Sequence, residues 1–302
     1  MKSIKVKDSN QYPDFRAALM ELAINKKRFE NKKEYYDEEQ DKKVIKDYYQ
    51  SIDFNQELYE QLNQLLTKTH VNQLPYNANT RDLLYTRVDL QMDGSLKSIY
   101  SGKEQDPEQV IIEDYDSDRK RKVAHEVLLK NYLNNDDDFQ SAVAIINQEN
   151  MFNCEHVVPQ SWFHEANPMR GDLHHLFTCE KVCNSARSNY PYFDFDDYPP
   201  KLVTEAIRTN CGKYVEEKFE PESGKGEVAR ATLYFLLRYP GEISRYQTKD
   251  IEMLLNWHSN HKVSLYEKHR NSEIFLLQQN RNPLIDLPEA AENIDFMLGL
   301  RT

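Results

Sequence analysis

The chain has 302 residues, of which 39% are hydrophobic and 29% are charged, and these proportions are typical of a globular protein with a sizeable core and exclude a disordered chain. No apolar run approaches the ~20 residues that a membrane-spanning helix needs, so no membrane partner is expected. The formal net charge is −11, whereas nucleic-acid-binding proteins are usually basic, so any contact with nucleic acid has to use a local basic patch.

The first 75 residues are predicted to form a helical N-terminal extension. Apolar residues recur at helical spacing around Leu22 and again around Leu62, as they do on amphipathic helices. The charged stretch between them, residues 26–43, is interpreted as a solvated helix surface, and binding of a protein partner or self-association is the alternative. The start of the chain lacks the apolar core of a secretory signal, so a cytosolic location is predicted unless a signal has been removed.

Two features precede the centre of the chain. Residues 83–102 are predicted to form a β-hairpin, because apolar and polar residues alternate there and Asp93-Gly94 is a turn signal. The run from Arg119 to Lys122 is the most basic in the chain. It is interpreted as the solvated start of a helix, with a phosphate contact as the alternative.

The C-terminal third is predicted to be helical, because apolar residues recur there at i, i+3 and i+4. Prolines separate the segments, and the whole chain contains only 8 glycines. No linker or internal repeat is evident, so we expect one α+β domain over residues 76–302 after the helical extension. The expected helices span residues 203–219, 227–239, 251–258 and 264–279.

The central stretch of the chain carries the residues that point to chemistry. Glu155 and His156 are adjacent, and Asn184 follows 28 residues after His156. Neighbouring residues of a strand point to opposite faces, so both side chains reach one site only where the strand bends or ends, and Pro159 supports such an end. A carboxylate and an amide oxygen are hard ligands that suit Mg²⁺ or Ca²⁺. The imidazole, which titrates near neutral pH, is then left to act as a general base.

This stretch resembles the endonuclease I family of His-Me finger (ββα-metal) nucleases. The resemblance rests on the motifs EHVVPQS, DLHHL and NSARSNYP, and it extends in the family's order to motifs on both sides, which makes it far more specific than any one motif. It covers roughly residues 80–290, has its finger core at residues 150–198, and leaves residues 1–75 outside. The central motifs begin at residues 155, 172 and 184, and the flanking ones lie at residues 84–86, 99–102, 226–231 and 280–286.

The resemblance implies a mostly helical α+β domain around a ββα-metal core with a small antiparallel sheet. Glu155 and Asn184 would bind one catalytic Mg²⁺, for which Mn²⁺ or Ca²⁺ can substitute. His156 would be the general base, oriented by a backbone carbonyl near Arg170. The substrates would be DNA and often RNA, cut with little sequence preference. The departures from the family pattern spare the ligands and the base, and they are Val158, Ser188 and Gln279.

Other polar residues of the stretch are assigned supporting roles. Asp172 and His174 share a face if they lie in a strand, so these two and His175 are interpreted as hydrogen-bonded residues that brace the site. Arg170 and Arg187 are candidates for binding phosphate, because a guanidinium fits two oxygens. For Arg187, a structural ion pair with a nearby carboxylate is the alternative.

The four cysteines of the chain all lie in or just after the predicted finger. Their positions are Cys154, Cys179, Cys183 and Cys211. Four thiolates can hold a structural Zn²⁺, two disulfides can form in an exported protein, or the thiols can be unconnected core residues. Clustering favours zinc, whereas the lack of a signal segment disfavours disulfides.

The sequence therefore predicts a non-specific, Mg²⁺-dependent endonuclease. In this hypothesis His156 activates a water that attacks phosphorus in line and leaves a 5′-phosphate, a polarity that only the resemblance implies. One alternative is a zinc hydrolase with His156, His174 and His175 as ligands, which is disfavoured because adjacent histidines do not easily share one face. The other is a non-catalytic nucleic-acid-binding or scaffold protein that keeps the finger for its shape.

Overall fold

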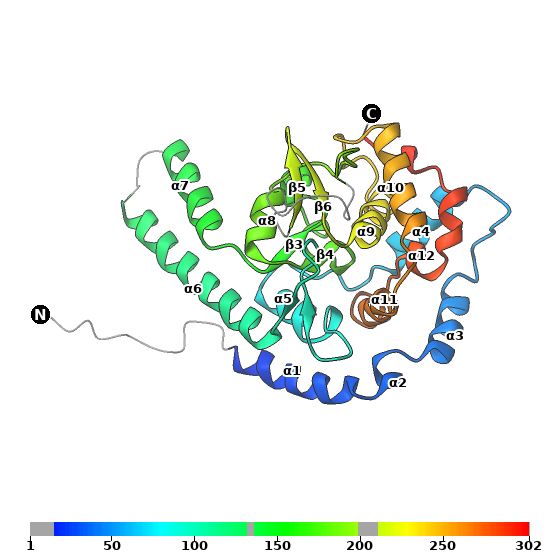
Figure 1. Ribbon diagram of the computed structural model, residues 1–302, viewed down its shortest axis with the longest axis horizontal. Coiled ribbons are helices and arrows are strands. Elements are labelled where there is room, and N and C mark those ends of the chain that lie inside the picture. Colours follow the sequence, from blue (N-terminus) through cyan, green and yellow to red (C-terminus); the bar gives the residue numbers. More distant parts are fainter. Residues whose placement is uncertain (1–14, 132–135, 199–210, 302) are drawn as a thin grey trace, which may run out of the picture.

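The computed structural model describes residues 15–131, 136–198 and 211–301 of the chain. Within these ranges the chain is mostly helical and contains three separate two-stranded antiparallel sheets (Figure 1). This arrangement confirms the predicted α+β fold class. Of the helices in the described ranges, none has the length and apolar character needed to cross a membrane.

The N-terminal helices pack on the rest of the protein instead of standing apart from it. Leu22 and Phe29 are fully buried and share a hydrophobic cluster with Leu84, and the helix that contains Leu62 packs against α9. Arg281, near the C-terminus, donates two hydrogen bonds to the carboxylate of Asp41 at 3.0 and 2.9 Å. The helices of this region are α1 (Arg16–Phe29), α2 (Lys32–Tyr35), α3 (Glu38–Tyr48) and α4 (Leu58–Thr69).

The segment predicted as a β-hairpin is only partly extended. Helix α5 (Ala78–Leu83) runs directly into a π-helical turn (Leu84–Val88), and the first half of the hairpin prediction is therefore wrong. Leu84, Tyr85 and Val88 of this turn are completely buried. Packing of these side chains therefore favours the helical conformation over the strand that the alternation of apolar and polar residues predicted. The turn at Gly94 does form, with φ +79°, but it precedes the short strand pair β1 (Leu96–Lys97) and β2 (Glu104–Gln105).

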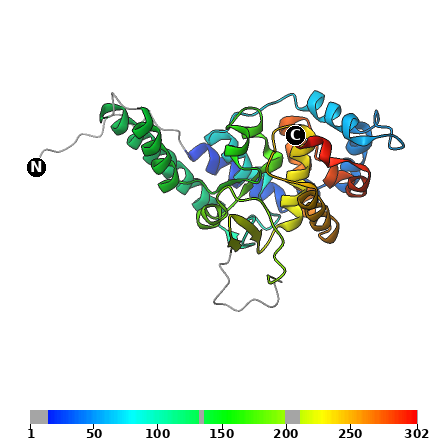
Figure 2. The same cartoon turned by 90° about the horizontal axis from the view of Figure 1, so that it is seen from above.

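Helices α6 (Pro107–Asn131) and α7 (Asp136–Glu149) pack against each other and project from the main body (Figure 2). The basic run from Arg119 to Lys122 lies in the middle of α6 rather than at a helix start. Asp114 and Ser117, which precede the basic run in the same helix, are buried where α6 meets the body. The first half of α6 is therefore fixed against the main body of the protein, beside the central stretch of the chain.

The predicted finger is present. Strand β3 (Cys154–His156) pairs antiparallel with β4 (Leu176–Thr178), so that Glu155 lies opposite Phe177, and helix α8 (Lys181–Arg187) follows. Three 3₁₀ turns lie between the strands, at Gln160–Phe163, Met169–Gly171 and Leu173–His175. One local expectation is wrong, because Asp172 caps a 3₁₀ turn of Leu173–His175 and these residues do not form a strand. Asn184 is the fourth residue of α8.

The predicted helix over residues 203–219 is wrong where the structure describes it. Residues 212–221 form a hairpin of β5 (Gly212–Val215) and β6 (Lys218–Pro221), while residues 203–210 lie outside the described ranges. The turn residues Glu216 and Glu217 have φ of 50° and 58°, the left-handed conformation of a tight hairpin turn. Such a pair of residues cannot continue a right-handed helix.

The helices predicted at residues 227–239, 251–258 and 264–279 are confirmed. They correspond to α9 (Lys225–Arg238), α10 (Thr248–Asn260) and α11 (Leu265–Gln278), and α12 (Pro283–Asp286) and two 3₁₀ turns (Pro288–Asn293 and Phe296–Gly299) follow. Ser264 and Glu267 form a capping box at the start of α11, which satisfies two free backbone N–H groups.

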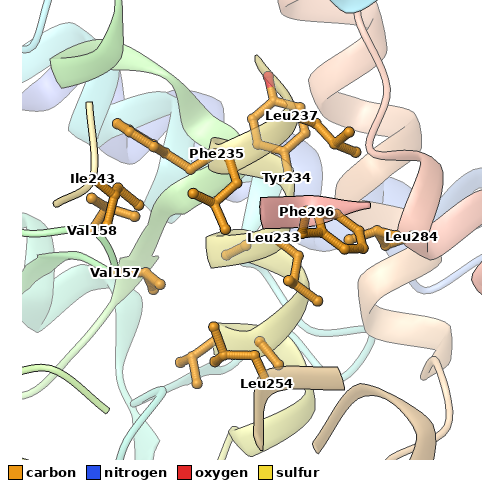
Figure 3. Packing of buried hydrophobic residues seen from close by; sticks show 14 of the residues in the cluster. Val157, Val158, Leu233, Tyr234, Phe235, Leu237, Ile243, Leu254, Leu284 and Phe296 are labelled. Atoms are coloured by element: carbon orange, nitrogen blue, oxygen red, sulfur yellow. The ribbon is translucent and has the colours of Figure 1, made fainter. Parts of the chain in front are cut away.

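Helix α9 runs through the centre of the core and anchors the finger. Its residues Leu233, Phe235 and Leu237 are completely buried, and Val157 and Val158, which follow β3 directly, belong to the same hydrophobic cluster (Figure 3). Burying each such side chain stabilises the fold by about 1.5–3 kcal/mol. The end of β3, where His156 lies, is therefore fixed to the most buried helix of the protein.

Candidate active site

A cleft of about 470 Å³ opens beside the finger. Glu155 and His156 of β3 and Asn184 of α8 all line it, so the structure brings the three residues together that the sequence singled out. Strand β3 ends at His156, and Pro159 follows two residues after Val157 at the edge of the same cleft. The end of the strand thus lets two adjacent side chains face one site.

Glu155 is a buried carboxylate with defined partners. The Tyr100 hydroxyl donates a hydrogen bond of 2.7 Å to its Oε1, and Nη1 of Arg187 lies 3.2 Å from the same oxygen. Burial raises the pKa of Glu155 to about 7, and the positive charge of Arg187 and the hydrogen bond from Tyr100 act in the opposite direction. A cation bound at this carboxylate would favour its ionised form further.

Asn184 presents its amide oxygen to the cleft. Its Nδ2 donates a hydrogen bond of 2.9 Å to the backbone oxygen of Cys154, which fixes the orientation of the amide and leaves Oδ1 without a donor in the described part of the chain. Oε2 of Glu155 likewise accepts no hydrogen bond from the residues that the structure describes. Two oxygens of different chemical type therefore face one cleft, and this donor set fits a hard divalent cation whose other positions are filled by water.

His156 is held as a neutral imidazole. Its Nε2 lies 2.9 Å from the backbone oxygen of Arg170, so the carbonyl near Arg170 that the family resemblance implied does face the ring. Nε2–H donates to this oxygen, and Nδ1 carries the free lone pair. Burial, and then the neighbouring His175, lower the pKa of His156 well below its ordinary value. The rings of Tyr76 and His175 pack against the imidazole at 4.6 and 5.5 Å between centroids.

The two candidate phosphate-binding arginines lie in different surroundings. Arg187 is almost completely buried, pairs with Glu155 and donates a hydrogen bond of 2.6 Å to the backbone oxygen of Val157, which is the ion-pair arrangement considered as the alternative for this residue. Arg170 is partly exposed at the cleft, donates to Gln160 at 2.7 Å and pairs with Glu165 at 3.0 Å. Its guanidinium therefore remains near the position a substrate phosphate would occupy.

Asp172 lies at the centre of a buried hydrogen-bond network behind the cleft. Its carboxylate accepts hydrogen bonds from the hydroxyls of Tyr234 at 2.8 Å and Tyr239 at 2.9 Å, and from Gln278 Nε2 at 2.9 Å. Burial alone would raise the pKa of Asp172, but the neighbouring histidines, of which His70 has the largest effect, and the hydrogen bond from Gln278 outweigh it, so that the pKa lies below its usual range.

His174 and His175 are buried and point to backbone oxygens. Nε2 of His175 lies 2.6 Å from the oxygen of Met169, and Nε2 of His174 lies 3.3 Å from the oxygen of Asn280. Neither residue lines the cleft. His175 packs directly against His156, so these two histidines and Asp172 are placed to brace the finger.

The cysteines do not form the zinc site that their clustering favoured. Cys183 and Cys211 form a disulfide, and Cys154 and Cys179 are separate buried thiols. The zinc prediction is therefore wrong, because two of the four sulfurs are bonded to each other. The disulfide joins α8, which carries Asn184, to the start of β5. It therefore fixes the helix that carries Asn184.

The histidine-ligated zinc site is not formed either. Each of His156, His174 and His175 directs Nε2 at a different backbone oxygen. Over residues 15–131, 136–198 and 211–301, no three His, Cys, Asp or Glu side chains are grouped so that they could hold a metal ion together. The pair of Glu155 and Asn184 falls outside this kind of group, because it contains only one such carboxylate and a neutral amide.

Sequence reasoning did not place three further residues at this site, although it offered a phosphate contact as the alternative for the basic run that contains Arg121. Tyr100 was noted only as part of a motif, and its hydroxyl also lies 2.8 Å from that of Tyr192. Tyr76 packs on His156, and Arg121 of α6 lines the cleft. Nothing in the local spacing of these residues indicates the contact, because each reaches the finger from a distant part of the chain.

Comparison with known proteins agrees with this geometry. A family model described as Endonuclease I matches residues 54–289, which is more than half of the chain. The chain therefore belongs to the endonuclease I family, whose members are in general metal-dependent. The match begins within the predicted N-terminal extension and includes α4.

Individual relatives are nucleases by name. The chain is 31% identical over 124 residues to a periplasmic deoxyribonuclease of Aeromonas hydrophila, covering 40% of this chain and 50% of the relative. It is 33% identical over 162 residues to an extracellular ribonuclease of Bacillus subtilis (strain 168), covering 47% and 54%. It is 27% identical over 161 residues to Endonuclease-1 of Buchnera aphidicola subsp. Baizongia pistaciae (strain Bp), covering 46% and 63%. The chain thus spans about half the length of the first of these relatives.

The comparison overturns the prediction of a cytosolic location. Several relatives are named as periplasmic or extracellular proteins, which points to a place outside the cytoplasm. The disulfide between Cys183 and Cys211 agrees with this correction, because disulfides form and persist in oxidising compartments.

Proposed function

We propose that this protein is a metal-dependent endonuclease that hydrolyses phosphodiester bonds of DNA, and of RNA, with little sequence preference. The observation that carries the proposal is the joint placement of Glu155, Asn184 and His156 around one cleft. The relatives' names, deoxyribonuclease and ribonuclease, support both substrates.

In the proposed mechanism His156 acts as the general base. Its Nε2–H is fixed on the Arg170 carbonyl, so Nδ1 accepts a proton from a water that attacks phosphorus in line with the leaving 3′ oxygen. The bond from the water oxygen to phosphorus forms and the bond from phosphorus to the 3′ oxygen breaks. The 3′ oxygen takes a proton from a solvent water, so a 5′-phosphate and a 3′-hydroxyl result. The neutral state of the buried imidazole keeps its lone pair available for this step.

Glu155 and Asn184 would hold Mg²⁺ through Oε2 and Oδ1. When bound there, the ion would stabilise the negative charge that develops on the phosphate and on the leaving oxygen. Arg187 and Tyr100 position the Glu155 carboxylate through its other oxygen, and Arg170 is placed to donate hydrogen bonds to the phosphate. Tyr76 and His175 keep the imidazole of His156 in one orientation.

A plasmid-nicking assay tests the proposal. The wild-type protein is expected to convert supercoiled DNA to nicked and linear forms with Mg²⁺ and to stop when EDTA is added. His156→Ala should lower the rate at least about a hundredfold, the lower end of what a general base contributes. His261→Ala is the matched control, because this histidine lies at the end of α10, away from the cleft.

Two outcomes would contradict the proposal. Full activity of His156→Ala would remove the assigned base. Binding of DNA by the wild-type protein without cleavage in either Mg²⁺ or Mn²⁺ would instead favour a non-catalytic nucleic-acid-binding protein. Parallel assays with a single-stranded RNA decide whether RNA is a substrate.

A further inference from the structure

One positively charged side chain of the cleft, that of Arg121, has no role in the proposed chemistry. Arg121 of α6 lines the same cleft as His156 and Asn184, although it belongs to the projecting helix pair. Residues of α7 and of the segment after it complete this wall. They include Asn147, Gln148, Met151 and Phe152. The cleft is therefore bounded by the finger on one side and by the α6–α7 pair on the other.

The guanidinium of Arg121 is held in a fixed position. Its Nε donates to the backbone oxygen of Asn150 and its Nη2 to that of Asn147, both at 2.8 Å. It also lies over the ring of Phe152, 4.0 Å from the centroid, and the guanidinium of Arg81 lies 3.5 Å from the same centroid. A side chain fixed in this way loses little further freedom when it binds a ligand.

The carboxylates near Arg121 are already paired with another arginine. Arg81 contacts Asp118 and lies 3.3 Å from Asp114. The other two arginines of the cleft also have carboxylate partners, Glu165 for Arg170 and Glu155 for Arg187. In the described ranges, no carboxylate forms an ion pair with Arg121. The wall opposite the finger therefore carries a positive charge that the protein leaves unpaired.

We propose that Arg121 binds a backbone phosphate of the nucleic acid beside the scissile phosphate, and that the α6–α7 pair forms the outer wall of the substrate cleft. This inference rests on the proposed function, because it extends the same cleft. Nη1 is the nitrogen of the guanidinium that is left to donate to a phosphate oxygen, because Nε and Nη2 already donate to backbone oxygens. A fixed guanidinium that lacks a carboxylate partner is suited to a phosphate oxygen.

The competing explanation is purely structural. The oxygens of Asn147 and Asn150 belong to the last turn of α7 and the residue after it, and an arginine that satisfies them could serve only to fix α6 to α7. The two explanations differ in one measurable quantity, the dependence of nucleic-acid affinity on salt. Each phosphate contact contributes about 0.9 to the slope of log K against log salt concentration for duplex DNA.

The experiment measures binding of a short fluorescein-labelled DNA duplex by fluorescence anisotropy at several salt concentrations. All proteins carry His156→Ala so that the duplex stays intact. Arg121→Gln is expected to bind about tenfold more weakly at low salt and to reduce the slope by about 0.9. Arg121→Lys should keep the slope. Lys120→Gln, an exposed neighbour outside the cleft with the same change of charge, should bind as the parent does.

The outcomes separate the two explanations and separate this inference from the proposed activity. An unchanged slope in Arg121→Gln overturns the inference, whatever happens to its melting temperature. A slope that falls equally in Arg121→Lys and Arg121→Gln, with loss of thermal stability in both, also overturns it in favour of the structural role. If the protein with His156 intact does not cleave but the Arg121-dependent slope is found, the binding site stands and the proposed nuclease activity fails.

Discussion

Removing the carboxylate of Asp172 tests whether the network behind the finger stabilises the protein. Asp172→Ala removes the acceptor of four buried hydrogen bonds, which are donated by the backbone N of His174, the amide of Gln278, and the hydroxyls of Tyr234 and Tyr239. Each unsatisfied buried donor costs about 1–3 kcal/mol. At the lower end of that range the free energy of unfolding falls by about 4 kcal/mol. A domain with a stability of about 5–15 kcal/mol loses a large fraction of it.

Urea unfolding followed by tryptophan fluorescence measures this loss, because Trp162 and Trp257 are both in the main core. Asp172→Asn, which keeps the shape and one acceptor oxygen, should lose about half as much as Asp172→Ala. Asp196→Ala is the matched control at an exposed aspartate, where a change within about 0.5 kcal/mol is expected. A loss below about 1 kcal/mol in Asp172→Ala would refute the reasoning, because the four donors would then have found other partners.

Three further results are expected. Tyr100→Phe removes the hydrogen bond to Glu155 and should lower kcat/KM about tenfold and raise the Mg²⁺ concentration for half-maximal activity; unchanged Mg²⁺ dependence would mean that the hydroxyl does not position the carboxylate. Cys211→Ser opens the disulfide with Cys183, whose sequence separation is 28, and should lower the free energy of unfolding by about 3–4 kcal/mol, measured in urea under oxidising conditions against the parent. Burial lowers the pKa of His174 to about 4, so the unfolded chain, with a pKa of ~6.5, binds the proton first as the pH falls. The free energy of unfolding should therefore fall by about 3 kcal/mol between pH 6.5 and pH 4, and an unchanged pH profile in His174→Gln would contradict this assignment.

The placement of Glu155, His156 and Asn184 around one cleft was largely predictable from the sequence because these residues lie close together in the chain. Glu155 and His156 are adjacent, and Asn184 belongs to the helix that follows the same strand pair. A strand that ends shortly before a proline lets two neighbouring side chains reach one site, and this could be reasoned from Pro159. The helices α9 to α11 were equally predictable, since long amphipathic segments carry a strong periodic signal.

The surrounding residues could not be predicted, because they depend on contacts between distant segments. Tyr100 and Glu155 are separated by 55 positions, and no local pattern indicates that they meet. Arg121 was assigned to a solvated helix start, with a phosphate contact as the alternative, but its position beside the cleft follows from how α6 packs on the body. For the same reason residues 1–75 were predicted to form a helical extension, but not to share a core cluster with the segment after them.

The predictions for the short strands and for the cysteines were wrong for different physical reasons. The strands β5 and β6 have four residues each, too few for alternation to be distinguished from a helical pattern. Their hairpin is set by the left-handed turn at Glu216 and Glu217. Four cysteines allow several pairings, and spacing alone does not choose between zinc, disulfides and free thiols. The pairing of Cys183 with Cys211 follows from the docking of α8 on β5.

The site is tested most directly by titrating the protein with Mn²⁺ and following the free ion by electron paramagnetic resonance. One site per chain is expected in the wild type and in His156→Ala, and no such site in Asn184→Ala, while cleavage should be lost in both variants. This pattern would show that the carboxylate and the amide hold the cation and that the imidazole does not. Unchanged Mn²⁺ binding in Asn184→Ala, or its loss in His156→Ala, would contradict the assignment of ligands and base.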